Sequence, residues 1–298
     1  MADWTVWPAP AKINLFLHVL GRRPDGYHEL QTAFQLLDHG DRVALRPRGD
    51  GRVERYQPLS GISEDADLTV RAARALQERA PAGAGVDIAV EKRLPAGGGL
   101  AGGSSDAATV LVALNWLWGV GLDEEALAHL GLGLGADVPV FVRGRSAWGE
   151  GVGERLLPLP EAAEGFPWYL VVDPGASVST AEVFSAPELT RDSAPIKISD
   201  LRAGEARNDC EAVVRARWPE VDRLLGWLCG YGRARMSGTG SCCFAGFATE
   251  EQARDALGAL PESWSGFVAR AVADSPLLEQ IQRAQAGQPV DNWGVAKR

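Results

Sequence analysis

A glycine-rich run at residues 94–106 constrains the fold of this chain more than any other feature of its sequence. Five of the seven residues from 97 to 103 are glycine. Because glycine has no side chain and costs conformational entropy, such a cluster marks backbone that bends sharply or approaches a ligand closely. Alternating apolar residues at 86–90 predict a strand before the run, and apolar residues at helical spacing over 107–118 predict a helix after it.

The end of the glycine-rich run is the expected start of that helix. Ser104, Ser105 and Asp106 are all good helix N-caps. A glycine loop that leads into a helix N-terminus presents unpaired N–H groups and the positive end of the helix dipole. The run therefore predicts a phosphate-binding loop rather than a flexible linker.

Two well-known nucleotide loops fit this run less well. Gly97, Gly99 and Gly102 match the dinucleotide-binding fingerprint, and Asp123 lies at a suitable distance beyond them. Asp123, however, begins its own predicted helix and does not end a second strand, so the ribose contact lacks its scaffold. The nucleoside-triphosphate P-loop is excluded, because glycine-lysine-serine and glycine-lysine-threonine are absent from the sequence. A phosphate loop of a third kind remains.

Length and composition predict an ordinary globular protein. The 298 residues are enough for two domains, which we expect at 1–160 and 161–298, since proline, glutamate and alanine become frequent near 156–165. The net charge of −9 argues against nucleic acid or an anionic membrane as a partner. No secretion signal or bilayer-spanning run is recognisable, and four cysteines without a CxxC pair fit a reduced, cytoplasmic protein.

Polar residues stand out in three places in the first half. Lys12 and Asn14 share one face of a strand expected over 9–20, either as a solvated face or as part of a site. Tyr27 and His28 follow a turn, where they could contact a planar ligand. Asp137 begins an apolar run at 136–142 that we expect to be a strand. Its carboxylate is either a structural partner or a catalytic group beside a cation.

The first half also predicts strands at 30–37 and 41–48, and a helix through about residue 79 that Asp67 should cap.

The second half predicts a sheet with helices on one side. Strands are expected at 168–172, on both sides of a glycine turn within 234–244, and at 267–272. Ser179 or Thr180 should cap a short helix that carries Phe184, and Thr249 should cap a later helix. Further helices are expected near 208–217 and 220–229. This order is typical of an α+β arrangement with an antiparallel sheet.

Three stretches together resemble the GHMP kinase superfamily in order and spacing. They are Pro-Ala-Lys-Ile-Asn-Leu at 10–15, the glycine-rich loop at 94–105, and Ser-Gly-Thr-Gly-Ser at 237–241. Residues 25–30 and 134–141 are similar to the branch that phosphorylates cytidine diphosphate methylerythritol in the non-mevalonate route to isoprenoid precursors. The resemblance runs from about Trp7 to about Pro276.

The resemblance implies an α+β, two-domain GHMP kinase fold. An N-terminal β-α-β phosphate-loop domain would be followed by a C-terminal ferredoxin-like domain. ATP and Mg²⁺ would be the cofactors, with Lys12 and Asp137 as the catalytic pair and Ser105 as a magnesium ligand. The implied ATP-binding residues are Asp67, Lys92, Pro95, Gly97, Gly98, Gly99, Leu100, Ala101, Gly102, Gly103, Ser104 and Ser105.

The same resemblance implies a binding site for a cytosine-containing substrate, whose C2 hydroxyl would receive the γ-phosphoryl group. Tyr27 and Phe184 would sandwich the base and His28 would read its edge. Asn14 and Thr180 would make polar contacts with the substrate. Asp137 would either orient the hydroxyl or take its proton; the sequence leaves both roles open.

Two residues depart from the family pattern. Ala101 stands where glycine is common, and we expect alanine to fit if its φ is negative. Asp67 stands where asparagine near the adenine is usual, and a carboxylate can accept but not donate that hydrogen bond.

Two other functions stay open at this point. One is another small-molecule GHMP kinase of the mevalonate or homoserine type. It is disfavoured because an aliphatic substrate needs no pair of aromatic rings. The other is a non-catalytic nucleotide-binding module, which the presence of both Lys12 and Asp137 disfavours.

Overall fold

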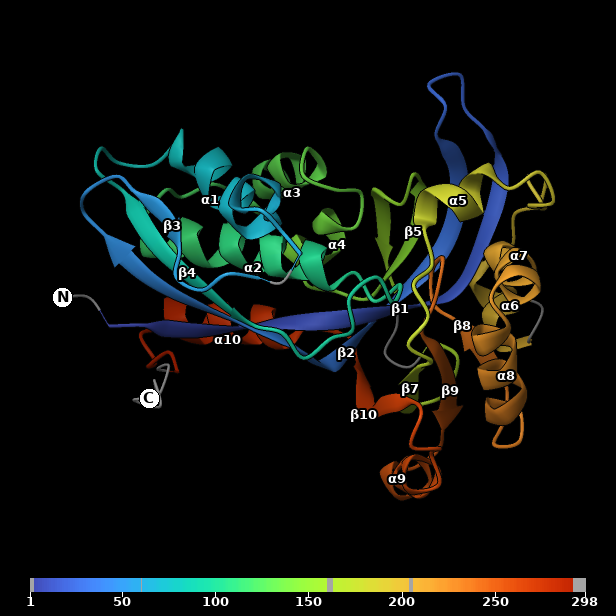
Figure 1. The fold of residues 1–298 in the computed structure, drawn as a ribbon. Coiled ribbons are helices and arrows are strands. Elements are labelled where there is room, and N and C mark those ends of the chain that lie inside the picture. Colours follow the sequence, from blue (N-terminus) through green and yellow to red (C-terminus); the bar gives the residue numbers. More distant parts are fainter. Residues whose placement is uncertain (1–2, 60, 160–162, 204–205, 292–298) are drawn as a thin grey trace.

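Two long antiparallel strands run through the whole molecule. The computed structural model describes residues 3–59, 61–159, 163–203 and 206–291. Strand β1 (Thr5–Arg22) pairs with β2 (His28–Arg48), and their shared hairpin rises beside helix α5 (Thr180–Ser185) (Figure 1). The register places Lys12 opposite Leu36 and Asn14 opposite Phe34. Both faces of β1 are largely buried, so it lies between two packed layers.

The first half builds a layer of helices over β1 and β2. The far end of β2 pairs with β4 (Gly85–Glu91), and β3 (Val53–Arg55) lies parallel to β4. The near end of β2 pairs with β5 (Ala147–Gly151), which pairs with β6 (Arg155–Pro158). The four helices gather on one side of this sheet (Figure 1). They are α1 (Leu68–Gln77), α2 (Gly102–Leu117), α3 (Glu124–Leu132) and α4 (Val138–Arg143).

The second half is the antiparallel layer that the sequence predicts. Strands β7 (Trp168–Asp173), β8 (Ala234–Met236), β9 (Cys243–Phe247) and β10 (Ser265–Val272) form it, in the spatial order β10-β7-β9-β8. Its helices include α6 (Ile198–Ala203), α7 (Asp209–Arg217), α8 (Pro219–Leu228) and α9 (Glu250–Gly258). Cys242 and Cys243 pack into two different apolar clusters, as expected for neighbours on opposite faces of a strand.

The end of the chain returns to the first half. β10 pairs with β7 along most of its length, and its last residues, Ala271 and Val272, pair with β2. Helix α10 (Pro276–Gln285) then buries Leu277 and Ile281 in the apolar core beneath α2. The two halves are thus joined by β1, β2 and β10. The predicted domain boundary at 160/161 lies outside the described residues and stays a prediction.

Several local predictions need correction. The apolar run at 136–142 is helix α4 rather than a strand, with Pro139 in its first turn. The strands expected at 30–37 and 41–48 are one continuous strand, β2. Helix α2 begins at Gly102, earlier than Ser104, and its N-cap is Ala101. Helices α6 and α10, the short helix η1 (Glu64–Ala66), and strands β3, β5 and β6 were not expected.

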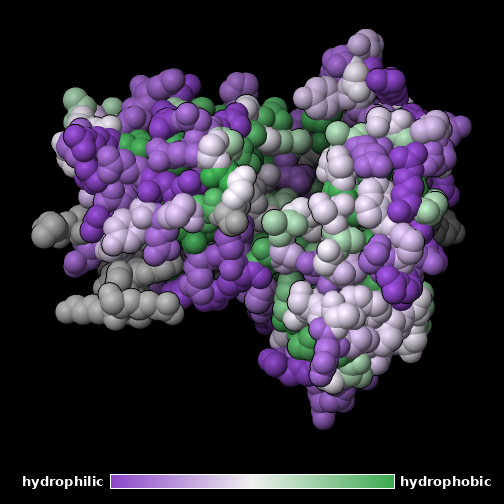
Figure 2. Space-filling model, viewed as in Figure 1, coloured by the Kyte–Doolittle hydropathy of each residue, from purple (hydrophilic) through white to green (hydrophobic). Residues whose placement is uncertain are grey.

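The face shown in Figure 2 carries many hydrophilic side chains, and it is hollowed between the part that carries α1–α4 and the part that carries α5–α8. Among the described residues, no helix has both the length and the apolar character needed to cross a bilayer. The four cysteines are free thiols, three of them buried.

Candidate active site

A cleft of about 940 Å³ brings together most of the residues that the sequence singles out. Its walls come from β1, the glycine-rich loop, the start of α4, α5 and the 238–239 turn. Leu100, Ser105, Tyr27 and His28 are the predicted residues that do not line it. The predicted residues that do are Lys12, Asn14, Asp67, Lys92, Pro95, Gly97, Gly98, Gly99, Ala101, Gly102, Gly103, Ser104, Asp137, Thr180 and Phe184.

Lys12 is a buried cation at the centre of this cleft. Its Nζ donates to Oδ1 of Asn14 at 2.6 Å and to the carbonyl of Gly99 at 2.8 Å. Oδ2 of Asp137 lies 3.6 Å from the same nitrogen. Burial lowers the pKa of Lys12, while the Asp137 carboxylate acts in the opposite direction. Asn14 is itself fixed by donating to Thr32 at 2.9 Å, so β1 and β2 hold the ammonium in one position.

Asp137 is the carboxylate that faces this ammonium. It is the N-cap residue of α4, but its side chain makes no capping hydrogen bond. The side chain keeps 31% of its exposure, whereas that of Lys12 keeps only 4%. A carboxylate that is left free by its own helix, lies beside a cation and is open to a cleft can meet a substrate hydroxyl. The expected pairing of Asp137 with a cation is confirmed, although the carboxylate comes from a helix.

The glycine-rich loop is held from behind by the second half of the chain. Ser237 donates through Oγ to the carbonyl of Gly99 at 2.9 Å, and Cys242 donates through its amide to that of Gly98 at 3.1 Å. A Cβ on Gly99 would lie 2.1 Å from the carbonyl oxygen of Ser237. Gly99 is therefore required for close backbone contact. Although 237–241 contributes to the resemblance, its bracing role has no local sequence signal.

Ala101 takes a backbone conformation that is unusual for alanine. Its φ is +57° and its ψ is +33°, which is the left-handed region, so the negative φ under which we expect alanine to fit does not occur. The residue forms the turn from the loop into α2, and its carbonyl accepts from the amide of Ser105 at 2.9 Å. The helix geometry thus imposes a conformation that is strained for alanine by about 1 kcal/mol or more.

Two oxygens at the start of α2 suit a hard cation. Ser105 is fully buried and its Oγ has no hydrogen-bond partner among the described residues; Oδ1 of Asp106 is likewise unpaired there. The other carboxylate oxygen of Asp106 accepts from Lys92 at 2.8 Å, and Lys92 also pairs with Asp41. Burial raises the pKa of Asp106 to about 7, against the opposing effect of Lys92. Oxygen donors of this type fit Mg²⁺.

Asp67 lines the cleft but is occupied by protein contacts. Its Oδ1 accepts from the amide and the hydroxyl of Thr69, at 2.9 and 2.7 Å, so it caps α1 as predicted. Its Oδ2 pairs with Arg55 at 3.2 Å. Both oxygens therefore serve the local fold, which leaves an adenine contact through Asp67 as an untested prediction.

Phe184 lines the other end of the cleft and carries an aromatic stack. The ring of His28 stacks on that of Phe184, with centroids 5.1 Å apart and planes at 23°. Tyr27 does not contact Phe184 in this structure; it lies at the hairpin tip, 65% exposed, with its amide donating to Asp25. Thr180 lines the cleft and shares a 2.9 Å hydrogen bond with Thr239. The stack joins β2 to α5, two elements from different halves.

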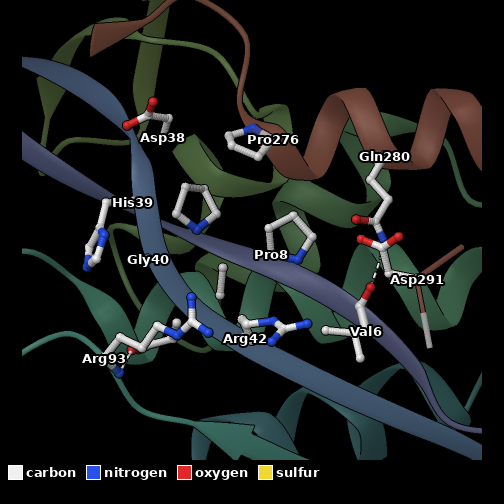
Figure 3. A pocket seen from close by; sticks show the side chains of 13 residues that line it. Val6, Pro8, Asp38, His39, Gly40, Arg42, Arg93, Pro276, Gln280 and Asp291 are labelled. Carbon is white, nitrogen blue, oxygen red and sulfur yellow. Dashed lines mark hydrogen bonds between the residues drawn. The ribbon is translucent and has the colours of Figure 1, made fainter. Parts of the chain in front are cut away.

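A smaller cavity of about 220 Å³ lies along β1 and β2 near α10 (Figure 3). Asp38, His39, Arg42 and Arg93 contribute to its lining, and Gln280 donates to the carbonyl of Val6 at 2.5 Å. None of the predicted ATP or substrate residues is among the described residues that line it. The large cleft is therefore the better candidate for catalysis.

Each half of the chain matches a known protein-family model. Residues 67–145 match the GHMP kinases N terminal domain, and residues 194–266 match the GHMP kinases C terminal domain, together more than half of the chain. The chain belongs to the GHMP kinase family. It is accordingly an ATP-dependent small-molecule kinase, and the two-domain GHMP kinase fold expected from the sequence is confirmed.

Individual GHMP kinases resemble this one to different degrees. The 4-diphosphocytidyl-2-C-methyl-D-erythritol kinase of Halorhodospira halophila is 72% identical over 96% of this chain and all of its own. That of Alkalilimnicola ehrlichii is 62% identical over 94% of this chain and 95% of its own. A crystal structure of 4-(cytidine 5'-diphospho)-2C-methyl-D-erythritol kinase matches with a TM-score of 0.76 and 37% identity, over 89% of this chain and 98% of that one. The homoserine kinase of Cytophaga hutchinsonii, at a TM-score of 0.66 and 16% identity, shares the fold.

Proposed function

We propose that this kinase transfers the γ-phosphoryl group of ATP to the C2 hydroxyl of 4-diphosphocytidyl-2-C-methyl-D-erythritol, in non-mevalonate isoprenoid precursor synthesis. One observation carries the proposal: a single cleft joins the glycine-rich loop and the Lys12–Asp137 pair to an aromatic wall at Phe184. Relatives that bear the name of this activity match the chain along nearly its full length.

The chemistry follows from charge and position. The loop amides and the N-terminus of α2 bind phosphate oxygens. Lys12 stabilises negative charge that develops during transfer, while Asp137 orients the hydroxyl or accepts its proton. Phosphoryl transfer is catalysed mainly by positioning and charge neutralisation, so no covalent intermediate is required. The hydrogen bond from Lys12 to Gly99 links the catalytic cation to the loop that holds ATP.

We infer a magnesium site at the start of α2. Ser105, the predicted ligand, has a buried hydroxyl without a partner in the described structure, and Asp106 offers an unpaired carboxylate oxygen. A bound Mg²⁺ would neutralise phosphate charge. The role of the two residues is to hold that cation next to the loop.

The substrate would extend from Asp137 to the aromatic end of the cleft. Asn14 and Thr180 are the proposed polar contacts along it, and both line the cleft. Phe184 and His28 are the proposed base contacts. Tyr27 would have to turn inward from the hairpin tip to complete a sandwich around the base.

Two broader expectations remain proposals. The division into domains 1–160 and 161–298 is supported by the change in composition near 156–165. A cytoplasmic location is supported by the four free cysteines. We propose small molecules, and neither nucleic acid nor membrane, as the partners of this acidic chain.

A coupled ADP-release assay tests the proposed reaction. The purified chain is given ATP and Mg²⁺ with 4-diphosphocytidyl-2-C-methyl-D-erythritol, mevalonate or homoserine. We expect ADP release with the first substrate alone. Turnover of mevalonate or homoserine without the cytidine compound would contradict the proposal, and ATP binding without turnover of any of the three would favour a non-catalytic module.

A further inference from the structure

Arg191 connects Phe184, which lines the cleft, to His28, which stacks on Phe184. It follows α5 in the chain and is partly buried. Its Nη2 donates to the carbonyls of Phe184 and Ala186, at 2.9 and 2.8 Å, and its Nη1 donates to that of Leu189 at 3.1 Å. Its Nε donates to Nε2 of His28 at 3.2 Å. One guanidinium thus fixes the end of α5 and the first residue of β2 together.

The bond from Arg191 determines where His28 carries its proton. A guanidinium can only donate, so Nε2 of His28 must offer a lone pair. A neutral imidazole has one N–H, which is then on Nδ1. No residue in the described part of the chain forms a hydrogen bond with this Nδ1. The ring therefore keeps one donor for a ligand.

Burial and neighbouring arginines keep the His28 imidazole neutral, and Phe184 holds it in a stacked position. Burial lowers the pKa of His28 first, and the positive charges of Arg191 and Arg22 lower it further. Stacking on Phe184, with planes at 23°, fixes the plane of the imidazole. The donor on Nδ1 thus has a defined direction as well as a defined chemistry.

We propose that Arg191 is a positioning residue that makes the base site select cytosine over uracil, by holding His28 in the Nδ1–H form. N3 of cytosine is a hydrogen-bond acceptor, which a donor on Nδ1 satisfies. N3 of uracil carries a hydrogen, so the same edge would set two donors against each other. This inference rests on the proposed function, because it assumes that the base of the substrate lies against His28 and Phe184.

The unaltered protein provides the first test. Nitrogen-15 NMR of the His28 ring, recorded near pH 7, should show a proton on Nδ1 and none on Nε2. Calorimetric titration with CDP and with UDP, with an ATP analogue saturating the nucleotide loop, should favour CDP about tenfold or more. A proton on Nε2 would overturn the role of Arg191 whether or not any variant folds.

Variants then separate Arg191 from general damage. Arg191→Met should lower the CDP/UDP preference about tenfold, move the His28 proton toward Nε2 and raise the pKa of His28, with ATP affinity unchanged. Arg191→Lys retains a donor and should restore part of the Nδ1–H population. Arg155→Met is the matched control, since Arg155 pairs with Glu29 of the same hairpin and not with the His28 ring.

The outcomes distinguish this inference from the proposed function. If Arg191→Met kept the CDP/UDP preference and the Nδ1–H form, the positioning role would be wrong while the kinase activity stood. If the unaltered chain neither bound CDP nor turned over its cytidine substrate, the proposed function would fail and selectivity for cytosine with it.

Discussion

At the scale of single residues, the site combines a fixed cation with a freer carboxylate. Lys12 is buried and makes hydrogen bonds to Asn14 and Gly99, so its position is set by the fold. Asp137 is partly exposed and makes no capping bond, so it can respond to a substrate. The fold therefore fixes the charge-stabilising ammonium more firmly than it fixes the carboxylate.

Replacement of Asp137 by asparagine should separate chemistry from binding. The amide keeps the size of the side chain but can neither accept a proton nor pair with Lys12 as a charge. We expect kcat to fall by about 10²–10⁴-fold, the usual contribution of such a group, with little change in ATP affinity. Steady-state kinetics and a nucleotide titration measure both. An unchanged kcat would remove Asp137 from the reaction.

Ala101 offers a test of backbone strain. Its φ of +57° favours glycine over alanine. Ala101→Gly should relieve strain in the folded state and should therefore raise the free energy of unfolding by up to about 1 kcal/mol, after the entropy that glycine adds to the unfolded chain. Urea unfolding measures this change. A lower unfolding midpoint in the variant would show that the alanine methyl contributes packing that outweighs the strain.

The residue types of the site and the Lys12–Asp137 pair were predictable, but the contact that Arg191 makes was not. Lys12, Asp137 and the loop glycines stand out in sequence because charge or glycine is unusual beside apolar strands and helices. Arg191 gives no such signal, since an arginine in a polar loop is ordinary. Its role depends on a contact with His28, which lies 163 positions away in the chain.

At the scale of secondary-structure elements, the loop between β4 and α2 depends on a second glycine loop. The segment 237–242 packs against Gly98 and Gly99 from the far half of the chain. Strand β1 completes this arrangement, because the amide of Asn14 donates to Oγ of Ser237 at 3.2 Å. Three segments distant in sequence therefore determine the shape of one phosphate loop.

Two glycines of the loop provide a matched pair for testing this packing. Gly97 and Gly99 have nearly equal φ angles, +70° and +74°, so alanine is strained at both. A Cβ would meet nothing within 4 Å at Gly97, but would lie 2.1 Å from the Ser237 carbonyl oxygen at Gly99. We expect Gly99→Ala to lower the free energy of unfolding by about 1–3 kcal/mol more than Gly97→Ala does. Equal losses in urea unfolding would show that the contact is unimportant.

Helix caps were the most predictable feature of the elements. Asp67 caps α1 through Thr69, and Thr249 caps α9 by accepting from the amide of Gln252 at 3.3 Å, both as expected. Helix α4 was mistaken for a strand, since the five consecutive apolar residues 138–142 show no period. Helix α10 was missed because its buried residues are interspersed with polar ones, and one of the buried residues, Gln280, is itself polar.

At the scale of the whole molecule, the two halves share one continuous framework. Strand β10 pairs with β7 in one half and with β2 in the other. The pairing of β10 with β2, like the return of α10, leaves no mark in the local sequence, because it depends on residues more than 200 positions apart. The order of the helices and strands could therefore be predicted from the sequence, whereas the contacts that join the two halves could not.

Because α10 packs in the core of the first half, we expect both halves of the chain to unfold in one cooperative transition. Leu277 is 1% exposed and packs in the core of the first half. Leu277→Ala should cost about 2–5 kcal/mol, while Gln282→Ala, at an exposed position of the same helix, should cost less than about 0.5 kcal/mol. Circular dichroism and tryptophan fluorescence should report one shared transition. Separate transitions for the two probes would show that the halves unfold independently.

The β1–β2 hairpin also sets the distance between the two ends of the candidate site. Lys12 lies ten residues before Arg22 on β1, whereas His28 begins β2 at the hairpin end, opposite Arg22. Strand register therefore sets the span between the site of phosphoryl transfer and the aromatic stack. Under the proposed function, a cytidine monophosphate ester of methylerythritol is one phosphate shorter than the substrate. It would therefore contact either the aromatic stack or the transfer site, but not both at once. It should compete with the full substrate in binding experiments, yet receive phosphate far more slowly in the ADP-release assay.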